Sequence, residues 1–90
     1  MTEIAKIIRV SGTVQGVSFR FYTQCEAEKL GVRGYARNLP DGRVEVFAEG
    51  EAARVRQLVN WLRQGPDTAV VDGITEEDVA PAGHHGFETG

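Results

Sequence analysis

The sequence predicts an α+β domain with the element order β-α-β-β-α-β, in which two helices cover one face of an antiparallel sheet. Short runs rich in β-branched residues indicate the strands, two longer segments that end at glycine indicate the helices, and a Pro-Asp-Gly turn joins two of the strands. Ninety residues with 41% apolar content suit one small domain, so residues 1–90 are expected to fold as a unit.

Four runs have the composition of strands, namely residues 4–10, 32–39, 43–50 and 68–74. Pro40 presets φ in the turn between the second and third runs, and Gly42 accepts a left-handed conformation, so these two runs form a hairpin. Residues 75–85 contain the acidic run Glu76-Glu77-Asp78 and are expected to be a polar, solvated connection. The stretch 86–89 is expected to form at most a short terminal strand.

Two segments have helical features. The first begins near Phe19 or Arg20 and ends at Gly31, and its apolar residues Tyr22, Cys25 and Leu30 fit helical spacing only loosely. The second covers residues 51–64. It places five apolar residues on one face, Ala52, Val55, Leu58, Val59 and Leu62.

This order gives two right-handed crossovers around a central hairpin, which is the ferredoxin-like α/β sandwich. Its first and second strands run parallel without being neighbours, so the loop after the first strand and the end of the second strand reach the same edge of the sheet. Residues 11–20 and 37–39 are therefore expected to converge.

The stretch SGTVQGVSFRFY, residues 11–22, is a candidate anion site. Consecutive backbone N–H groups in a glycine-containing loop before a helix form a concave set of donors, and the helix start adds partial positive charge. Arg20 follows this loop with a planar guanidinium that can hold two phosphate oxygens. The alternative is that Gly12 and Gly16 merely permit a turn and that Arg20 is a solvated helix residue.

Asn38 ends the second strand. Its amide both donates and accepts hydrogen bonds and so can orient a water molecule, although asparagine before Leu-Pro-Asp-Gly is also ordinary turn chemistry. Only the expected convergence with Arg20 favours a catalytic pair.

Spacing excludes two phosphate motifs. Gly12 and Gly16 have three residues between them where a P-loop has four, and Gly-x-Gly-x-x-Gly is absent. The neighbourhood also lacks a nucleophilic serine with a histidine, a carboxylate pair and metal ligands, so its reaction must need little acid or base help. A carboxylate leaving group, with a pKa of about 4, departs without a proton. These residues suit an acyl phosphate better than a phosphomonoester.

Charge and composition narrow the function classes further. The net charge of −3 argues against bulk nucleic-acid binding, while the first 43 residues carry an excess of Lys and Arg that could attract a small anion. Cys25 is the only cysteine, so no disulfide framework or cysteine metal cluster is possible, and its expected role is that of a small helix residue. The sequence has no apolar run of membrane-spanning length and no signal-peptide pattern. A cytoplasmic protein without membrane contact is therefore expected.

Residues 10–50 resemble the acylphosphatases, whose signature runs Gly-x-Val-Gln-Gly-Val-x-Phe-Arg and then Gly-Tyr/Trp-x-x-Asn near an Asp-Gly turn. The resemblance implies hydrolysis of the carboxyl–phosphate bond without metal or cofactor, by a protein expected to be a monomer. It further implies that Arg20 and the backbone N–H groups of Gln15, Gly16, Val17, Ser18 and Phe19, here named the donor loop, bind the phosphoryl group. Asn38 would orient the attacking water, and the substrate's own phosphate would take the water's proton.

Two other functions stay open. Residues 33–36, Arg-Gly-Tyr-Ala, match the start of an RNA-recognition motif in a domain of the same topology, although further stacking aromatics do not follow. The second alternative is an acylphosphatase-like domain that handles carbamoyl phosphate in a maturation enzyme. His84 and His85 are expected to be solvated, and the position of Trp61 is left undecided.

Overall fold

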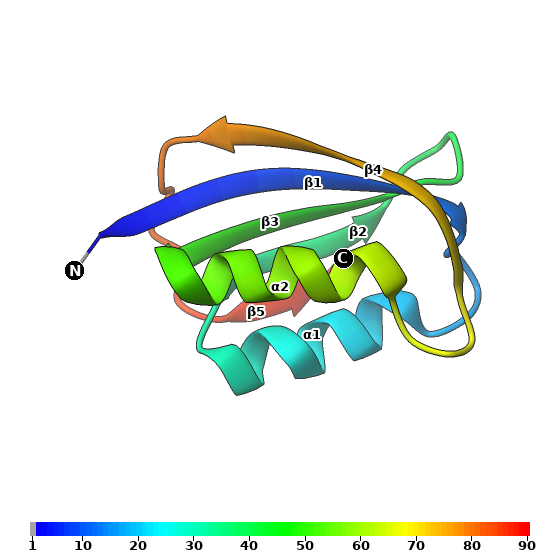
Figure 1. Ribbon diagram of the computed structural model, residues 1–90, viewed down its shortest axis with the longest axis horizontal. Helices are drawn as coiled ribbons and strands as arrows, with labels where there is room; N and C mark the ends of the chain where they lie inside the picture. The colour runs from blue at the N-terminus through cyan, green and yellow to red at the C-terminus, as the bar shows by residue number, and fades with distance from the viewer. Residues whose placement is uncertain (1) are drawn as a thin grey trace.

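The computed structural model describes residues 2–90 and forms five strands and two helices (Figure 1). In chain order these are β1 (Glu3–Thr13), α1 (Phe19–Leu30), β2 (Arg33–Asn38), β3 (Val44–Glu51), α2 (Ala52–Gln64), β4 (Val70–Val79) and β5 (Phe87–Thr89). The predicted order of elements is confirmed, including the central hairpin and the short terminal strand.

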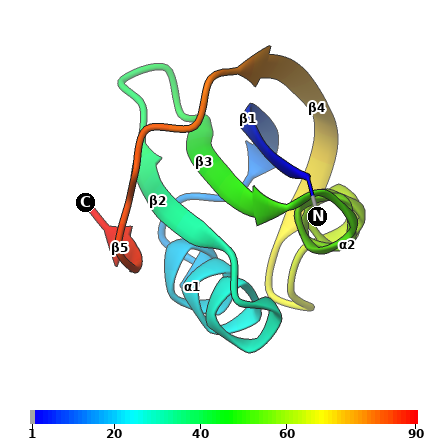
Figure 2. The same ribbon diagram turned by 90° about the vertical axis from the view of Figure 1, so that its left-hand side faces the viewer.

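The five strands form one sheet in the order β4-β1-β3-β2-β5. The first four are antiparallel to their neighbours, whereas β5 pairs parallel to β2. Both helices lie on one face of the sheet, as Figure 2 shows end-on. The predicted ferredoxin-like sandwich is therefore confirmed, with a fifth strand that makes the sheet mixed.

The core lies between the sheet and the helices. Helix α2 contributes Val55, Leu58, Val59 and Leu62, as its spacing predicts. The buried residues of α1 are instead Phe19, Thr23 and Ala27, whereas Tyr22 and Cys25 are exposed. Thr23 can be buried because its hydroxyl donates to the carbonyl oxygen of Phe19 at 2.8 Å. Apolar character alone therefore predicts the wrong face for this helix.

Strand β4 is longer than predicted, because the acidic run continues the strand rather than forming a solvated connection. Each acid of this run faces a base. Lys6 lies 2.7 Å from Asp78 and 3.5 Å from Glu76, Arg63 lies 2.7 Å from Glu76, and Arg9 lies 3.4 Å from Glu77. An edge strand can carry such charged side chains because one of its sides is open to water.

Strand β1 runs on past residue 10, where the predicted run ends, and has a bulge between Ser11 and Gly12. Gly12 has φ of 129°, and a Cβ atom there would lie 2.1 Å from the carbonyl oxygen of Val70. The glycine therefore permits close contact between β1 and β4 and sets the direction in which the chain enters the next loop.

The segment between β4 and β5 crosses the sheet on the face opposite the helices (Figure 2). Glu49 of β3 is fully buried beneath it and accepts hydrogen bonds from the backbone N–H groups of Ala82, Gly83 and His84. His84 Nδ1 also lies 3.0 Å from the Glu49 carboxylate, so the prediction of a solvated His84 is wrong, while His85 is exposed. Trp61 is partly buried, with its ring centroid 6.2 Å from that of Phe19.

Candidate active site

The loop between β1 and α1 and the β2–β3 hairpin lie at the same end of the molecule (Figure 1). The expected convergence of these segments is therefore confirmed. The physical reason is that β1 and β2 are both antiparallel to β3 and so finish at one edge of the sheet.

The backbone of the donor loop is sharply turned. Gly16 and Ser18 both have left-handed φ values, 75° and 61°, and Phe19 begins α1. Left-handed residues next to a helix start turn successive N–H groups toward one side, which forms an anion-binding concavity. Within residues 2–90 the N–H groups of residues 15–20 have no hydrogen-bond partner, and the first helical bond runs from Tyr22 N to Ser18 O. These donors are available to a ligand.

A cavity of about 390 Å³ opens beside this loop. Its lining residues are Val14, Gly16, Ser18, Phe19, Arg20, Phe21, Asn38 and Thr89. The structure thus brings the two side chains of the expected catalytic pair, Arg20 and Asn38, to one cavity. Three of the five donor-loop residues also line it.

The other two donor-loop residues fix the loop in place. The Gln15 side chain donates from Nε2 to the carbonyl oxygens of Leu39 at 2.9 Å and Arg43 at 3.0 Å. The carbonyl oxygen of Val17 accepts a hydrogen bond from the Thr68 hydroxyl at 2.9 Å. Gln15 therefore ties the donor loop to the hairpin that carries Asn38, a side-chain role that the sequence analysis missed.

Arg20 differs from most other arginines of the chain in its ion pairing. Five other arginines form ion pairs with carboxylates at 2.7 to 3.4 Å, namely Arg9, Arg33, Arg37, Arg43 and Arg63. Among residues 2–90, no aspartate or glutamate pairs with Arg20, and its Nη1 donates instead to the backbone oxygen of Gly90. A guanidinium that no acidic side chain neutralises can hold an incoming anion.

Asn38 is the last residue of β2 and is exposed to solvent at the cavity. Its carboxamide makes no hydrogen bond to another part of residues 2–90, while the turn beside it is closed by backbone bonds between Leu39 and Arg43 and between Gly42 and Leu39. The turn therefore does not use this side chain, which is free to hold a water molecule.

The sequence analysis missed Thr89, Phe21 and Val14 as lining residues. Thr89 reaches the cavity through the pairing of β5 with β2, where it lies opposite Ala36. No sequence pattern gives the register of a three-residue strand. Phe21 had one signal, because it is a large apolar residue directly after Arg20.

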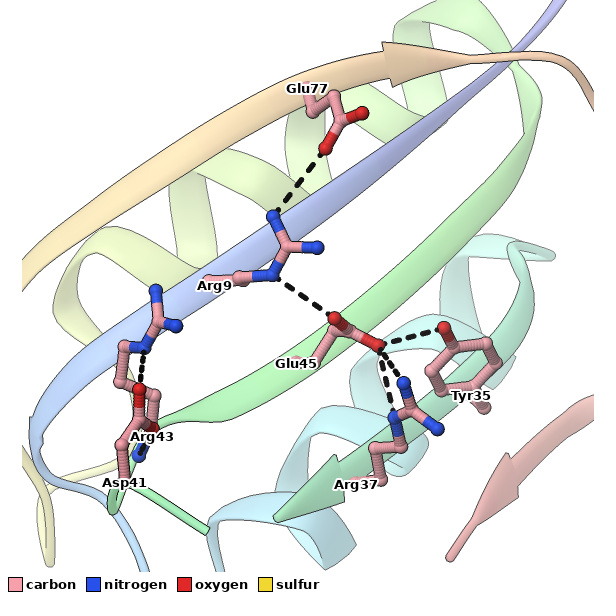
Figure 3. Close-up of polar contacts among 7 residues, drawn as sticks. All are labelled: Arg9, Tyr35, Arg37, Asp41, Arg43, Glu45 and Glu77. Atoms are coloured by element: carbon pink, nitrogen blue, oxygen red, sulfur yellow. Dashed lines mark hydrogen bonds and ion pairs between the residues drawn. The ribbon is translucent and has the colours of Figure 1, made fainter. Parts of the chain in front are cut away.

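The outer face of the sheet carries a separate charged cluster (Figure 3). Its centre is Glu45, which accepts from Arg9 Nε at 3.1 Å, from the Tyr35 hydroxyl at 2.9 Å and from Arg37 Nε at 2.9 Å. Burial alone would raise the pKa of Glu45, but the hydrogen bonds from Tyr35, Arg37 and Arg9 more than offset this and lower it. Tyr35 also stacks on Phe47 at 5.7 Å. The one aromatic of the Arg-Gly-Tyr-Ala stretch is thus engaged within the protein, which disfavours base stacking.

In residues 2–90 no group of three histidine, cysteine or acidic side chains is placed to hold a metal ion. Over the same range, no helix has the length and apolar character to span a membrane.

The fold and this cavity define a small ferredoxin-like domain with a cavity lined by an arginine and an asparagine at one sheet edge. The family model described as Acylphosphatase matches residues 6–89. An acylphosphatase of Rubrobacter xylanophilus is 55% identical over 90% of this chain and 74% of its own length. One of Anaeromyxobacter dehalogenans is 55% identical over 91% and 87%. The solved acylphosphatase from Coxiella burnetii superposes with a TM-score of 0.92 at 36% identity, covering 97% of this chain and 92% of that one.

This chain belongs to the acylphosphatase family. Membership makes it an enzyme, and acyl phosphate hydrolysis is its activity.

Proposed function

We propose that this chain hydrolyses acyl phosphates at the cavity lined by Arg20 and Asn38, with the donor loop as its phosphoryl site. One observation carries the proposal. Within residues 2–90, a guanidinium that pairs with no acidic side chain and a carboxamide with no hydrogen-bond partner line a single cavity beside unpaired N–H groups. The elements that place them lie apart in the chain and meet at one edge of the sheet.

The phosphoryl group binds first. Its oxygens accept hydrogen bonds from the N–H groups of residues 15–19, and Arg20 holds two of them with its planar fork. These fixed donors stabilise the negative charge that the phosphoryl oxygens carry in the transition state, without reorganising at the moment of reaction.

Asn38 then orients a water molecule toward phosphorus. The water oxygen forms a bond to phosphorus, the bond from phosphorus to the carboxyl oxygen breaks, and the carboxylate leaves with the electron pair. The water's proton moves to a phosphoryl oxygen of the substrate. Because a carboxylate with a pKa of about 4 is a good leaving group, neither step requires an acid or a base from the protein.

The proposal includes three further expectations. Hydrolysis proceeds without a metal or other cofactor, residues 1–90 act as one domain and as a monomer, and the protein works in the cytoplasm without nucleic acid or membrane.

The experiment is hydrolysis of acetyl phosphate by the purified protein in the presence of EDTA. An equal kcat with and without EDTA supports the proposal. Loss of turnover that returns on adding a divalent cation contradicts the metal-independent mechanism. A protein that is inactive both with EDTA and after a divalent cation is added contradicts the proposed function.

A further inference from the structure

Phe21 is a large apolar residue at the cavity with no role in the core. It lines the cavity beside Arg20, and 58% of its surface is exposed. Its nearest aromatic neighbour is Tyr22, in an edge-to-face pair with a centroid distance of 5.6 Å, and Tyr22 is itself 42% exposed. Single exposed apolar residues are common on protein surfaces, but an exposed aromatic pair beside a polar cavity indicates a contact surface, because core packing does not explain it.

The position of Phe21 on α1 places it at the cavity mouth. Side chains on a helix lean toward the helix N-terminus, and Phe21 is in the first turn, so its ring leans toward the donor loop. Val14 and Phe19 also line the cavity, and each is only 1% exposed. These two residues therefore form the inner wall, and Phe21 is an outer apolar surface.

We propose that Phe21 is the contact site for the acyl group, and that this side chain sets how strongly the protein distinguishes an aromatic acyl group from a methyl group. The inference rests on the proposed function, because it needs the phosphoryl group in the donor loop. With phosphorus held there, the acyl group points out of the cavity and passes Phe21. The cavity volume of about 390 Å³ lies within the range of small-molecule sites, so a ring and a phosphoryl group both fit.

The contact acts on binding rather than on the chemical step. It lies away from the reacting phosphorus and is the same in the bound substrate and in the transition state. Such an interaction lowers KM and leaves kcat unchanged. A ring on the acyl group gains an aromatic pair with Phe21, whereas the methyl group of acetyl phosphate is too small to cover it.

The experiment compares KM for benzoyl phosphate with KM for acetyl phosphate in four proteins: wild type, Phe21→Ala, Phe21→Tyr and Val70→Ala. Phe21→Ala should raise the benzoyl-to-acetyl KM ratio about 2- to 12-fold, the range that one aromatic pair contributes. Phe21→Tyr keeps the ring and should keep the wild-type ratio. Val70, which is 61% exposed and does not line the cavity, is the matched control and should also leave the ratio unchanged.

Two failures are distinguishable. A wild-type protein that hydrolyses both substrates, with a KM ratio that Phe21→Ala leaves unchanged, overturns the contact site and leaves the proposed function standing. A wild-type protein that hydrolyses neither substrate overturns the proposed function and the contact site with it. Circular dichroism of each variant checks that the fold is intact.

Discussion

Arg20 differs from most arginines of this chain, because no aspartate or glutamate among residues 2–90 pairs with it. The paired arginines are partly neutralised, while Arg20 donates to the backbone oxygen of Gly90. A phosphoryl group offers two charged acceptors to the guanidinium fork, so an incoming substrate can replace the single contact with Gly90.

Arg20→Lys keeps the positive charge and removes the planar fork. Because hydrogen bonds to charged groups contribute about 1.5 to 3 kcal/mol each, we expect kcat/KM for acetyl phosphate to fall about 10- to 150-fold. Arg63→Lys is the control, since Arg63 pairs with Glu76 outside the cavity. Equal kinetics for Arg20→Lys and the wild type would remove the guanidinium from the mechanism.

Asn38→Ala removes the group that orients the water. The variant should fold, because the turn beside Asn38 is closed by backbone bonds. We expect a loss of about 2 to 4 kcal/mol of transition-state stabilisation, by analogy with the removal of one oriented polar group. The measurement is kcat for acetyl phosphate beside that of Asn60→Ala, an exposed asparagine on α2. Wild-type turnover in Asn38→Ala would refute the assigned role.

Residues of the site were predictable to different degrees. Arg20, Asn38 and a glycine-containing anion loop within residues 11–22 follow from local sequence together with one topological argument, whereas the bounds of the donor loop come from the family resemblance. Thr89 and the anchoring side chain of Gln15 do not, because both depend on which backbone groups the folded chain brings opposite them.

At the scale of elements, the bulge in β1 sets the entry into the donor loop. A Cβ atom at Gly12 would overlap the Val70 carbonyl oxygen, and φ of 129° is strained for any other residue. We expect Gly12→Ala to lower the free energy of unfolding by at least about 2 kcal/mol. Urea denaturation measures this against Gly42→Ala, where φ is 95° and no atom lies within 4 Å of the added Cβ. Equal losses in both variants would mean that the close contact with Val70 is not a constraint.

The Glu49 contacts make the free energy of unfolding depend on pH. Burial raises the pKa of Glu49, but the N–H groups of His84, Ala82 and Gly83 more than offset this and lower it. Since the folded pKa lies below the unfolded value of about 4.3, the stabilisation is complete above that pH and is lost as pH falls through the folded pKa.

Glu49→Gln should therefore cost about 1.5 to 3 kcal/mol at pH 7, the range for hydrogen bonds to a charged group, and flatten the loss of stability below about pH 4.3. The measurement is urea denaturation from pH 3 to pH 7. Glu77→Gln is the control, because Glu77 is exposed and its ion pair with Arg9 is 3.4 Å long. An acid limb as steep in Glu49→Gln as in the wild type would contradict this account.

The sequence predicted which helices and strands exist, but it did not predict the buried face of α1 or the length of β4. The pattern of α2 matches its buried face because its apolar residues repeat regularly, while α1 buries Thr23 through a local hydrogen bond that composition does not show. The length of β4 depends on Lys6 and Arg63, which are distant in the chain, so its acidic end resembled a solvated connection.

For the molecule as a whole, we expect the leaving group to decide which substrates react, because the mechanism supplies no general acid to protonate it. An alkoxide leaving group needs a proton, and general acid catalysis contributes about 100- to 10,000-fold. We expect kcat/KM for a simple alkyl phosphomonoester to be at least about 100-fold below that for acetyl phosphate. Inorganic phosphate release measures both rates, and comparable values would show that the site supplies a proton.

The central claim is that the donor loop, Arg20 and Asn38 form one phosphate site. Titration of ¹⁵N-labelled protein with inorganic phosphate in the presence of EDTA tests it most directly. We predict that the backbone amides of residues 15–20 and the Asn38 side-chain amide shift along one binding curve, with a dissociation constant equal to the constant for competitive inhibition by phosphate. Saturable shifts at a different surface, with these resonances unmoved, would contradict the claim.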